Sequence, residues 1–229
     1  MTTRMTALRM TAQRMTDQGL LALARHEGIV PAPYLDATGT WTFGIGHTAA
    51  AGAPDPSTMP RGMPADLDAA IREAFRVFRT DLTRYEDDVL SAVKVPLAPH
   101  EFDALVSFHY NTGGIARAVL TRHLNMGNRV AAANAFLHWR RPASVIPRRE
   151  AERDLFREGR YPVGPIPVWG VDAHGRVDFS QPVQRLTETQ AFALLRPSPA
   201  PPSPVSEPDA PTEFLARLAA HLSRLFRRS

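Results

Sequence analysis

Three residues near the start of the chain have side chains and spacings suited to acid–base chemistry: Glu27, Asp36 and Thr42. Glu27 lies in helical register with Leu20 and Ala24, on the apolar face of an expected helix. A carboxyl group held against apolar neighbours loses hydration, which disfavours its charged form. A carboxyl group that keeps its proton at neutral pH can act as a general acid. The alternative is a solvated acid at a fraying helix end.

Asp36 and Thr42 are equidistant from Gly39, which predicts a hairpin that places the two residues nearly opposite each other. Opposed residues point to the same face of a sheet, with their β-carbons roughly 5 Å apart. Gly44 and Gly46 continue this face and are expected to leave it open, so a carboxylate, a hydroxyl and bare backbone would converge. The alternatives are a turn aspartate that bonds its own backbone and a threonine chosen for strand propensity.

Helical periodicity dominates the elements that must position these side chains. Gly28 is expected to end the first helix. Apolar residues at three-or-four spacing run from Leu67 to Val93 and predict a helix roughly 40 Å long, which suggests two lobes joined by a spine. Further helices are expected over residues 102–109, 119–124, 130–137 and 148–158, the last of them ending at Gly159.

Strand signals are few beside this helical content. A second hairpin is expected around residues 172–175, flanked by 168–169 and 177–179, and Thr187 opens a capping box before a short helix to Leu195. The sequence therefore predicts an α+β fold, mostly helical and two-lobed, with a small N-terminal antiparallel β-hairpin or sheet and a long connecting helix.

Both ends of the chain differ in composition from the middle. Residues 1–15 repeat Arg-Met-Thr without an acid and are expected to form a disordered basic arm. Seven prolines fall within residues 197–211, which predicts a semi-rigid linker. Residues 212–229 place leucines and phenylalanines on one stripe and four arginines mostly on the other face, which predicts a basic amphipathic helix on an anionic membrane or lipopolysaccharide surface. The alternatives are docking onto the folded body and pairing with a second copy.

Composition excludes several classes of protein. The 229 residues include no cysteine, which removes disulfides, thiolate metal sites and cysteine nucleophiles. The net charge of +4 comes from arginines interspersed with acids, so no nucleic-acid partner is expected. The eight histidines show no ligand pairing, and no metal is expected. No run of 18 apolar residues and no signal-type stretch occurs, so we expect the protein to accumulate in the bacterial cytoplasm.

The residues that could do chemistry also carry a family resemblance. The segments EGI at 27–29, PYLD at 33–36 and GTWTFGIGHT at 39–48 resemble the active-site signature of phage-type lysozymes, glycoside hydrolase family 24. Later segments agree with it: FDALVSF at 102–108, NTG at 111–113, 120–127 and RREAER at 148–153. The resemblance covers about residues 16–161 and implies a catalytic domain there. Residues 49–62 and an appended hairpin and short helix over 162–196 depart from the family.

The resemblance implies a muramidase that cleaves the β-1,4 bond between N-acetylmuramic acid and N-acetylglucosamine in peptidoglycan, for host lysis and particle release. Glu27 would protonate the glycosidic oxygen, Asp36 would stabilise the transition state or orient a water, and Thr42 would hold that water. It implies no cofactor. Residues that match the family at supporting positions are Tyr34, His47, Asn111, Arg148 and Arg149; of the two arginines, Arg148 is favoured as the contact of Glu27.

Rival interpretations remain at this point. A lytic transglycosylase shares a glutamate acid and a related fold, although the pair of Asp36 and Thr42 favours hydrolysis. A non-catalytic protein that binds the cell wall or a membrane is the other alternative. We expect a monomer that reaches periplasmic peptidoglycan only after a holin has opened the inner membrane.

Overall fold

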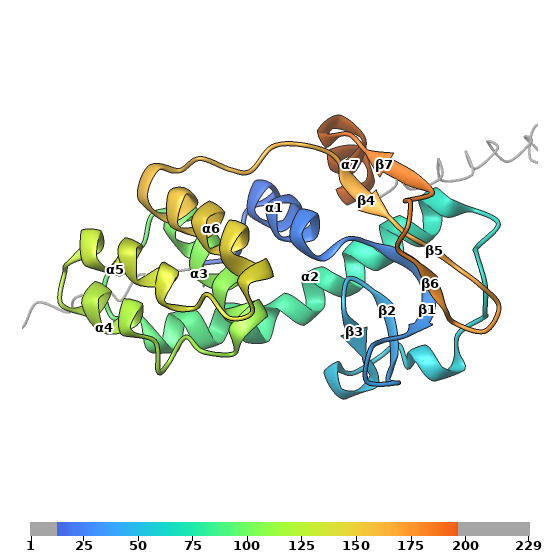
Figure 1. Ribbon diagram of the computed structural model, residues 1–229, viewed down its shortest axis with the longest axis horizontal. Coiled ribbons are helices and arrows are strands. Elements are labelled where there is room, and N and C mark those ends of the chain that lie inside the picture. The colour runs from blue at the N-terminus through green and yellow to red at the C-terminus, as the bar shows by residue number, and fades with distance from the viewer. Residues whose placement is uncertain (1–12, 197–229) are drawn as a thin grey trace, which may run out of the picture. The chain divides into compact units, whose positions relative to one another are not determined.

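The computed structural model describes residues 13–196 (Figure 1). It begins with helix α1 (Asp17–Glu27), whose N-cap Thr16 accepts a hydrogen bond from the backbone N–H of Gly19. Gly28 ends the helix as predicted, with a φ of +74° that side-chain-bearing residues rarely adopt. Five consecutive residues of α1, from Leu20 to Ala24, are buried.

A three-stranded antiparallel sheet follows, in the order β1 (Val30–Leu35), β2 (Trp41–Gly44) and β3 (His47–Thr48). The hairpin between β1 and β2 was predicted, but its register was not. Thr42 lies opposite Tyr34, and the backbone N–H of Asp36 donates to Thr40 O over 3.0 Å. The expectation that Asp36 directly opposes Thr42 is therefore wrong, because the carboxylate of Asp36 closes a turn with Thr40. Asp36 and Thr42 lie diagonally along the hairpin.

The glycines that follow are not the open surface that the pattern suggested. A β-carbon on Gly44 would lie 3.1 Å from the β-carbon of Ala74, so this glycine lets a helix approach the sheet. A β-carbon on Gly46 would lie 2.7 Å from the hydroxyl oxygen of Tyr110, which donates to Ile45 O. The expectation of an open glycine face is therefore wrong, because Ala74 and Tyr110 pack against the two glycines.

Helix α2 (Leu67–Ala92) is the long connecting helix that the apolar stripe predicted. Asp66 caps its N-terminus by accepting from Ala69 N–H. Its buried side chains include Ile71, Phe78 and Val89, one near each end and one in the middle. In Figure 1 α2 runs from the sheet to the group of helices α3–α6.

The remaining helices of the catalytic region form the second lobe. They are α3 (Pro99–Thr112), α4 (Val119–Asn125), α5 (Arg129–Ala135) and α6 (Ile146–Glu158), with short 3₁₀ turns at Phe136–His138 and Ala143–Val145. Two further 3₁₀ turns, at Ala49–Ala51 and Pro56–Thr58, lie between β3 and α2. Gly159 ends α6 in the left-handed region, as predicted. The architecture is α+β and mostly helical, in agreement with the sequence.

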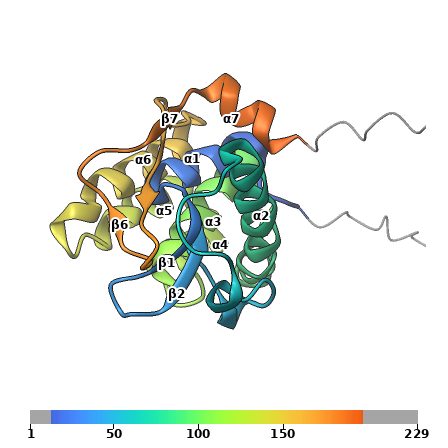
Figure 2. The same cartoon turned by 90° about the vertical axis from the view of Figure 1, so that its right-hand side faces the viewer.

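The appended segment, residues 162–196, packs onto the catalytic region. Strands β4 (Ile166–Val168) and β7 (Gln184–Leu186) pair, as do β5 (Gly170–Val171) and β6 (Val177–Asp178), before α7 (Glu188–Leu195). The hairpin at 172–175 and the helix after Thr187 are confirmed, whereas Val168 pairs with β7 and does not flank the hairpin. Figures 1 and 2 both show α7 beside α1 and α2, which it contacts.

One end of the folded body needs correction. Residues 13–15 were assigned to the basic arm, yet Met15 is buried in the core and Arg14 forms ion pairs with Glu86 and Asp87. Residues 1–12, the linker 197–211 and the segment 212–229 lie outside the described residues. Among the helices of residues 13–196, none has the length and apolar character needed to cross a bilayer.

Candidate active site

Glu27 is the last residue of α1, and its carboxylate is held by an arginine. Arg148 Nη1 donates to Glu27 Oε1 over 2.6 Å, with the Glu27 side chain 27% exposed and the Arg148 side chain 9% exposed. The expected apolar setting is only half right. Leu20 and Ala24 are buried on the inner face of α1, but the carboxylate of Glu27 accepts a hydrogen bond from the guanidinium group of Arg148.

Arg148 is in turn fixed from below by a buried acid. Its Nε donates to Glu152 Oε1 over 3.0 Å, and its Nη2 donates to Ser107 O over 3.1 Å. Ser107 Oγ also donates to Glu152 Oε1. Glu152 was not singled out from the sequence, although its place four residues after Arg148 on one helix face was a usable signal.

Arg149 lies deeper than Arg148 and reaches from the interior to Asn111, an exposed residue at the end of α3. Arg149 is fully buried, pairs with Glu152 Oε2 over 2.6 Å and donates from Nη2 to Asn111 Oδ1 over 2.5 Å. Its guanidinium carbon also lies 5.2 Å from the ring centroid of Phe108. These contacts support α6 against α3, and the contact with Glu27 belongs to Arg148.

Asp36 binds its own turn through one carboxylate oxygen. Oδ1 accepts hydrogen bonds from Thr38 N–H, Thr38 Oγ1 and Thr40 N–H over 2.7 to 2.9 Å. The hydrogen bond from the Thr38 hydroxyl and that from the Thr40 backbone hold the pKa of Asp36 below its ordinary value. Asp36 is therefore a partly exposed anion at neutral pH.

Tyr34 lies opposite Thr42 in the hairpin, two residues before Asp36. Burial, followed by the negative charges of Asp36 and Glu27, raises the pKa of the Tyr34 phenol to about 12. The Thr42 hydroxyl donates to Thr40 O over 3.1 Å, which leaves its lone pairs as acceptors.

His47 matches a family position but has a supporting place in the fold. It is buried, with Nδ1 2.8 Å from Asp81 Oδ2 and Nε2 2.7 Å from Pro54 O. It thereby ties β3 to α2 and to the departing segment 49–62. Its contacts fit the packing role that the sequence suggested.

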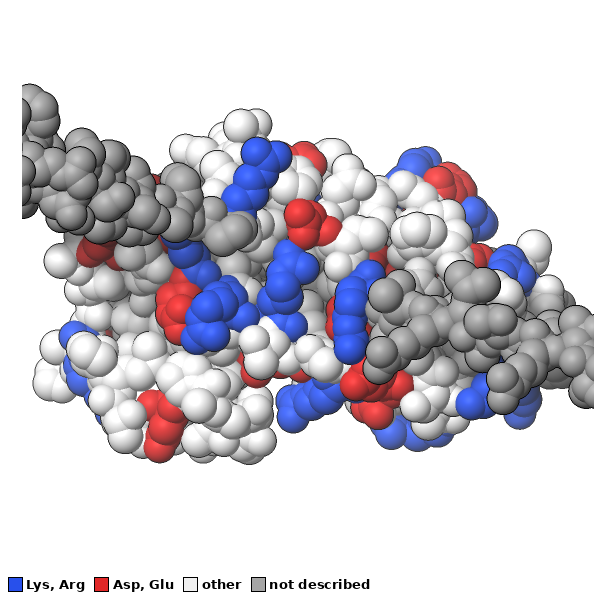
Figure 3. Space-filling model, turned by 180° about the vertical axis from the view of Figure 1, so that it is seen from behind, with Lys and Arg blue, Asp and Glu red and all other residues white. Residues whose placement is uncertain are grey.

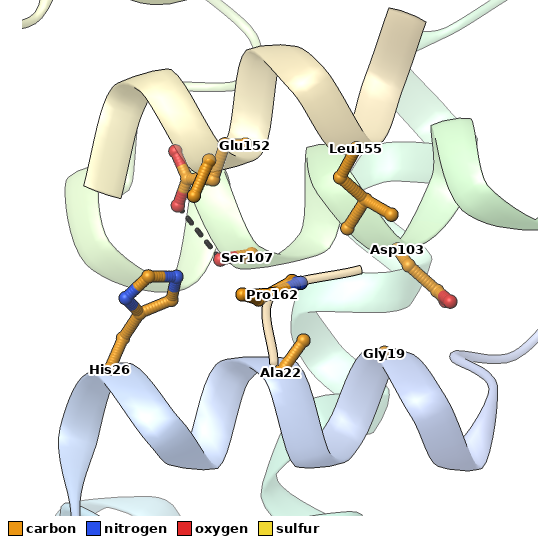
Figure 4. Close-up of a pocket in the computed structure, with 9 residues that line it drawn as sticks. Gly19, Ala22, His26, Asp103, Ser107, Glu152, Leu155 and Pro162 are labelled. Carbon is orange, nitrogen blue, oxygen red and sulfur yellow. Dashed lines mark hydrogen bonds between the residues drawn. The ribbon is translucent and has the colours of Figure 1, made fainter. Parts of the chain in front are cut away.

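A small cavity lies behind the acid, between α1, α3 and α6. Figure 4 shows His26, Ala22 and Gly19 on α1 facing Glu152 and Ser107 across it. Burial and then the charges of Arg148, Arg149 and Arg25 lower the pKa of His26 to about 4. A neutral imidazole therefore lies beside the Arg148–Glu152 pair at physiological pH. Within residues 13–196, no three or more His, Asp or Glu side chains are grouped to hold a metal ion.

Surface charge is mixed over the described part of the chain. Figure 3 shows Arg and Lys side chains next to Asp and Glu side chains in small groups. Arg79 pairs with Asp17, and Arg76 with Glu73. Pairing of this kind divides the face into small neutral patches, unlike the continuous basic stripe of a nucleic-acid-binding surface.

The chain is similar to known phage proteins over the region that contains this site. The phage lysozyme family profile matches residues 24–152. The chain is 36% identical over 144 residues to an endolysin of Salmonella phage P22, covering 60% of this chain and 94% of that protein. It is 30% identical over 151 residues to an endolysin of Acyrthosiphon pisum secondary endosymbiont phage 1, covering 61% and 95% of the two chains.

Solved structures give the same result. A P22 lysozyme mutant superposes with a TM-score of 0.54 at 32% identity, covering 62% of this chain and 97% of that one. The endolysin from Escherichia coli O157:H7 phage FAHEc1 superposes with a TM-score of 0.56 at 28% identity, covering 65% and 96%. The family match spans more than half of the 229 residues and contains Glu27, Asp36 and Thr42, so this chain belongs to the phage lysozyme family.

Proposed function

We propose that this protein is an endolysin of the muramidase type, a glycoside hydrolase of family 24. It cleaves the β-1,4 bond between N-acetylmuramic acid and N-acetylglucosamine in peptidoglycan. The observation that carries the proposal is that Glu27 and Arg148 form an ion pair at the end of α1, directly before the hairpin that bears Asp36 and Thr42, and that all four residues lie within the family match.

In this mechanism Glu27 gives its proton to the glycosidic oxygen as the bond to the anomeric carbon breaks. Positive charge develops on the sugar ring, and the anionic Asp36 stabilises it or orients a water molecule for attack. Thr42 holds that water through the lone pairs of its hydroxyl. The hydroxyl group of the water bonds to the anomeric carbon, which gives a sugar with a reducing end. The remaining proton of the water replaces the proton that Glu27 donated.

Arg148 positions the acid in this scheme. Arg148 forms ion pairs with both Glu27 and the buried Glu152. Glu152 takes no part in the reaction, and its negative charge compensates part of the positive charge of Arg148. Ser107 and Glu152 fix the guanidinium from below, which restricts the direction that Glu27 can take.

Replacement of the acid tests the proposal. Glu27→Gln keeps the shape of the side chain but removes the transferable proton, so hydrolysis of purified Gram-negative peptidoglycan should fall about 10²- to 10⁴-fold. Glu150→Gln removes an exposed carboxyl group from α6 and serves as the matched control. Near-wild-type clearing by the Glu27 variant would refute the assignment. Products with 1,6-anhydro sugars, in place of ordinary reducing ends, would indicate a transglycosylase.

Access to the wall and the role of the last segment are further parts of the proposal. We propose a monomer that is made in the cytoplasm and meets peptidoglycan once a holin opens the inner membrane. Expression without a holin should leave cells largely intact, and rapid lysis blocked by a secretion inhibitor would contradict this route.

The basic segment 212–229 is proposed to bind anionic lipid or lipopolysaccharide, on the strength of its apolar stripe and net charge of +3. A chain that ends at residue 211 should still clear isolated peptidoglycan but lose binding to anionic vesicles. Unchanged vesicle binding with a smaller oligomer would instead identify the segment as a pairing helix.

A further inference from the structure

The appended segment reaches the strand that leads away from the catalytic acid. Trp169 N–H donates to Ile29 O over 2.8 Å, and Ile29 N–H donates to Pro167 O over 3.0 Å. Val168 and Ile29 thus form a parallel bridge at the edge of β1. In Figure 1 β5 and β6 lie beside β1. The backbone of Trp169 thus bonds Ile29, which is two residues after Glu27 in the sequence.

The indole of Trp169 lies against the backbone beside the acid. A β-carbon on Gly28 would lie 2.5 Å from Trp169 Nε1, so the glycine is what allows the ring to approach. The ring packs on a small apolar cluster of Val30, Ala32 and Val171, and Tyr34 packs on the same cluster. Trp169 therefore shares the face of the hairpin that carries Tyr34, which lies opposite Thr42.

A second aromatic side chain extends this surface outward. The ring of Phe179 meets that of Trp169 edge to face, with centroids 5.4 Å apart and planes at 67°. Phe179 is 64% exposed. Strong exposure of a large apolar ring is costly in water, and an exposed ring next to a catalytic site is typical of a surface that binds something.

We propose that Trp169 and Phe179 form an additional binding surface for the glycan strand, beyond the sugars held at the cleavage site. This inference rests on the proposed function. The C–H faces of pyranose rings are apolar, while their hydroxyl and N-acetyl groups stay hydrated, so a sugar packs flat on an aromatic ring without losing its polar contacts. The continuity of this surface with Glu27 through Gly28 makes further sugars of the same strand the fitting occupant. The family match ends at residue 152, before this surface begins.

Kinetics on substrates of two lengths test the surface. Phe179→Ser should raise KM for long, uncross-linked glycan strands roughly three- to tenfold, the loss expected for one aromatic contact. The increase should shrink on oligosaccharides too short to reach past the cleavage site. Val163→Ser is the matched control, because Val163 is an 86% exposed apolar residue of the same segment outside the aromatic pair.

Binding without cleavage separates this inference from the proposed function. In a Glu27→Gln background, long glycan strands should change the tryptophan fluorescence, and Trp169→Phe should remove most of that change. If the wild-type enzyme has no muramidase activity, the proposed function fails. If it cleaves strands but Phe179→Ser leaves KM unchanged at both lengths, the added surface is refuted. Loss of binding to anionic vesicles or a shift in oligomer size in the Phe179 variant, with KM unchanged, would also refute it.

Discussion

Two neighbouring arginines on α6 have separate tasks. Arg148 reaches the catalytic carboxylate, whereas Arg149 points into the protein toward Asn111 and the ring of Phe108. A helix turns about 100° per residue, so adjacent side chains cannot share one direction. Glu152 forms ion pairs with both guanidinium groups. Its negative charge partly compensates the two positive charges, which lie next to each other in the protein interior.

His26 should make the stability of the protein depend on pH. Its folded-state pKa of about 4 lies below the ordinary value of 6.5, so between these values the unfolded chain binds a proton that the folded chain does not. Stability should therefore fall as the pH drops from about 6.5 to about 4, by at most about 3 kcal/mol. Chemical denaturation at pH 7 and at pH 4.5 measures the difference.

The matched variants are His26→Gln and His174→Gln, since His174 is exposed. The His26 variant should lose clearly less stability on acidification than the wild type, and the His174 variant should behave like the wild type. An equal pH dependence in all three proteins would show that other groups carry the effect.

Residue types pointed to candidate catalytic side chains but not to their surroundings. Glu27, Asp36 and Thr42 could be proposed from the sequence because their order and spacing along the chain are local properties. The burial of Glu152 could not be predicted from the sequence. Glutamate is seldom fully buried unless it is paired, and the partners of Glu152 come from two different helices. The surface at Trp169 and Phe179 was missed for a similar reason. It depends on strand pairing between segments more than 130 residues apart.

The joint between α1 and β1 is a single glycine with two constraints. Gly28 has a φ of +74° and a ψ of 173°, a region of backbone conformation that is essentially restricted to glycine. It also lies under the indole of Trp169. The joint sets both the direction of the acid and the approach of the appended segment.

Gly28→Ala should therefore destabilise the protein by about 1–3 kcal/mol through the backbone alone, with an added cost from the collision with Trp169. Gly39→Ala is the control, because Gly39 also has a positive φ of +80° but nothing lies within 4 Å of an added β-carbon. Urea unfolding should rank the Gly28 variant below the Gly39 variant. In a Trp169→Ala background the gap between them should narrow, and an unchanged gap would contradict the collision.

Elements with long repeats were predicted well, and short ones less well. The stripe that defines α2 repeats over seven turns, so a single misplaced residue cannot alter it. The β1–β2 hairpin is short, and its register depends on which side chain closes the turn. Asp36 bonds Thr38 and Thr40 and thereby moves its partner two residues from the symmetric expectation.

The appended segment is hydrogen-bonded to both α1 and α2. Arg25 Nε on α1 donates to Gly164 O, and Arg72 on α2 donates to Ala193 O. Ile166, Val168 and Leu186 are fully buried within the main core. The segment 49–62 meets it at Trp41. Arg61 lies 3.5 Å over the ring of Trp41, and a β-carbon on Gly175 would lie 2.6 Å from an atom of the same ring. The two departures from the family thus pack together.

Removal of residues 162–229 should therefore damage the catalytic domain itself. Each fully buried aliphatic side chain contributes about 1.5–3 kcal/mol, so the loss of Ile166, Val168 and Leu186 should lower the melting temperature by at least about 10 °C. A chain that ends at residue 196 is the control and should melt within a few degrees of the full chain. Equal melting of the chain that ends at residue 161 would show that the segment is dispensable.

The outer margin of β1 has a consequence for behaviour at high concentration. Its Ile29 and Leu35 N–H groups donate to Pro167 O and Gly175 O, and between them Pro31 and Pro33 carry no N–H at all. A strand whose donors are taken or missing is a poor template for the backbone of a neighbouring molecule. This side of the sheet should therefore be closed to strand-by-strand aggregation when the protein is concentrated.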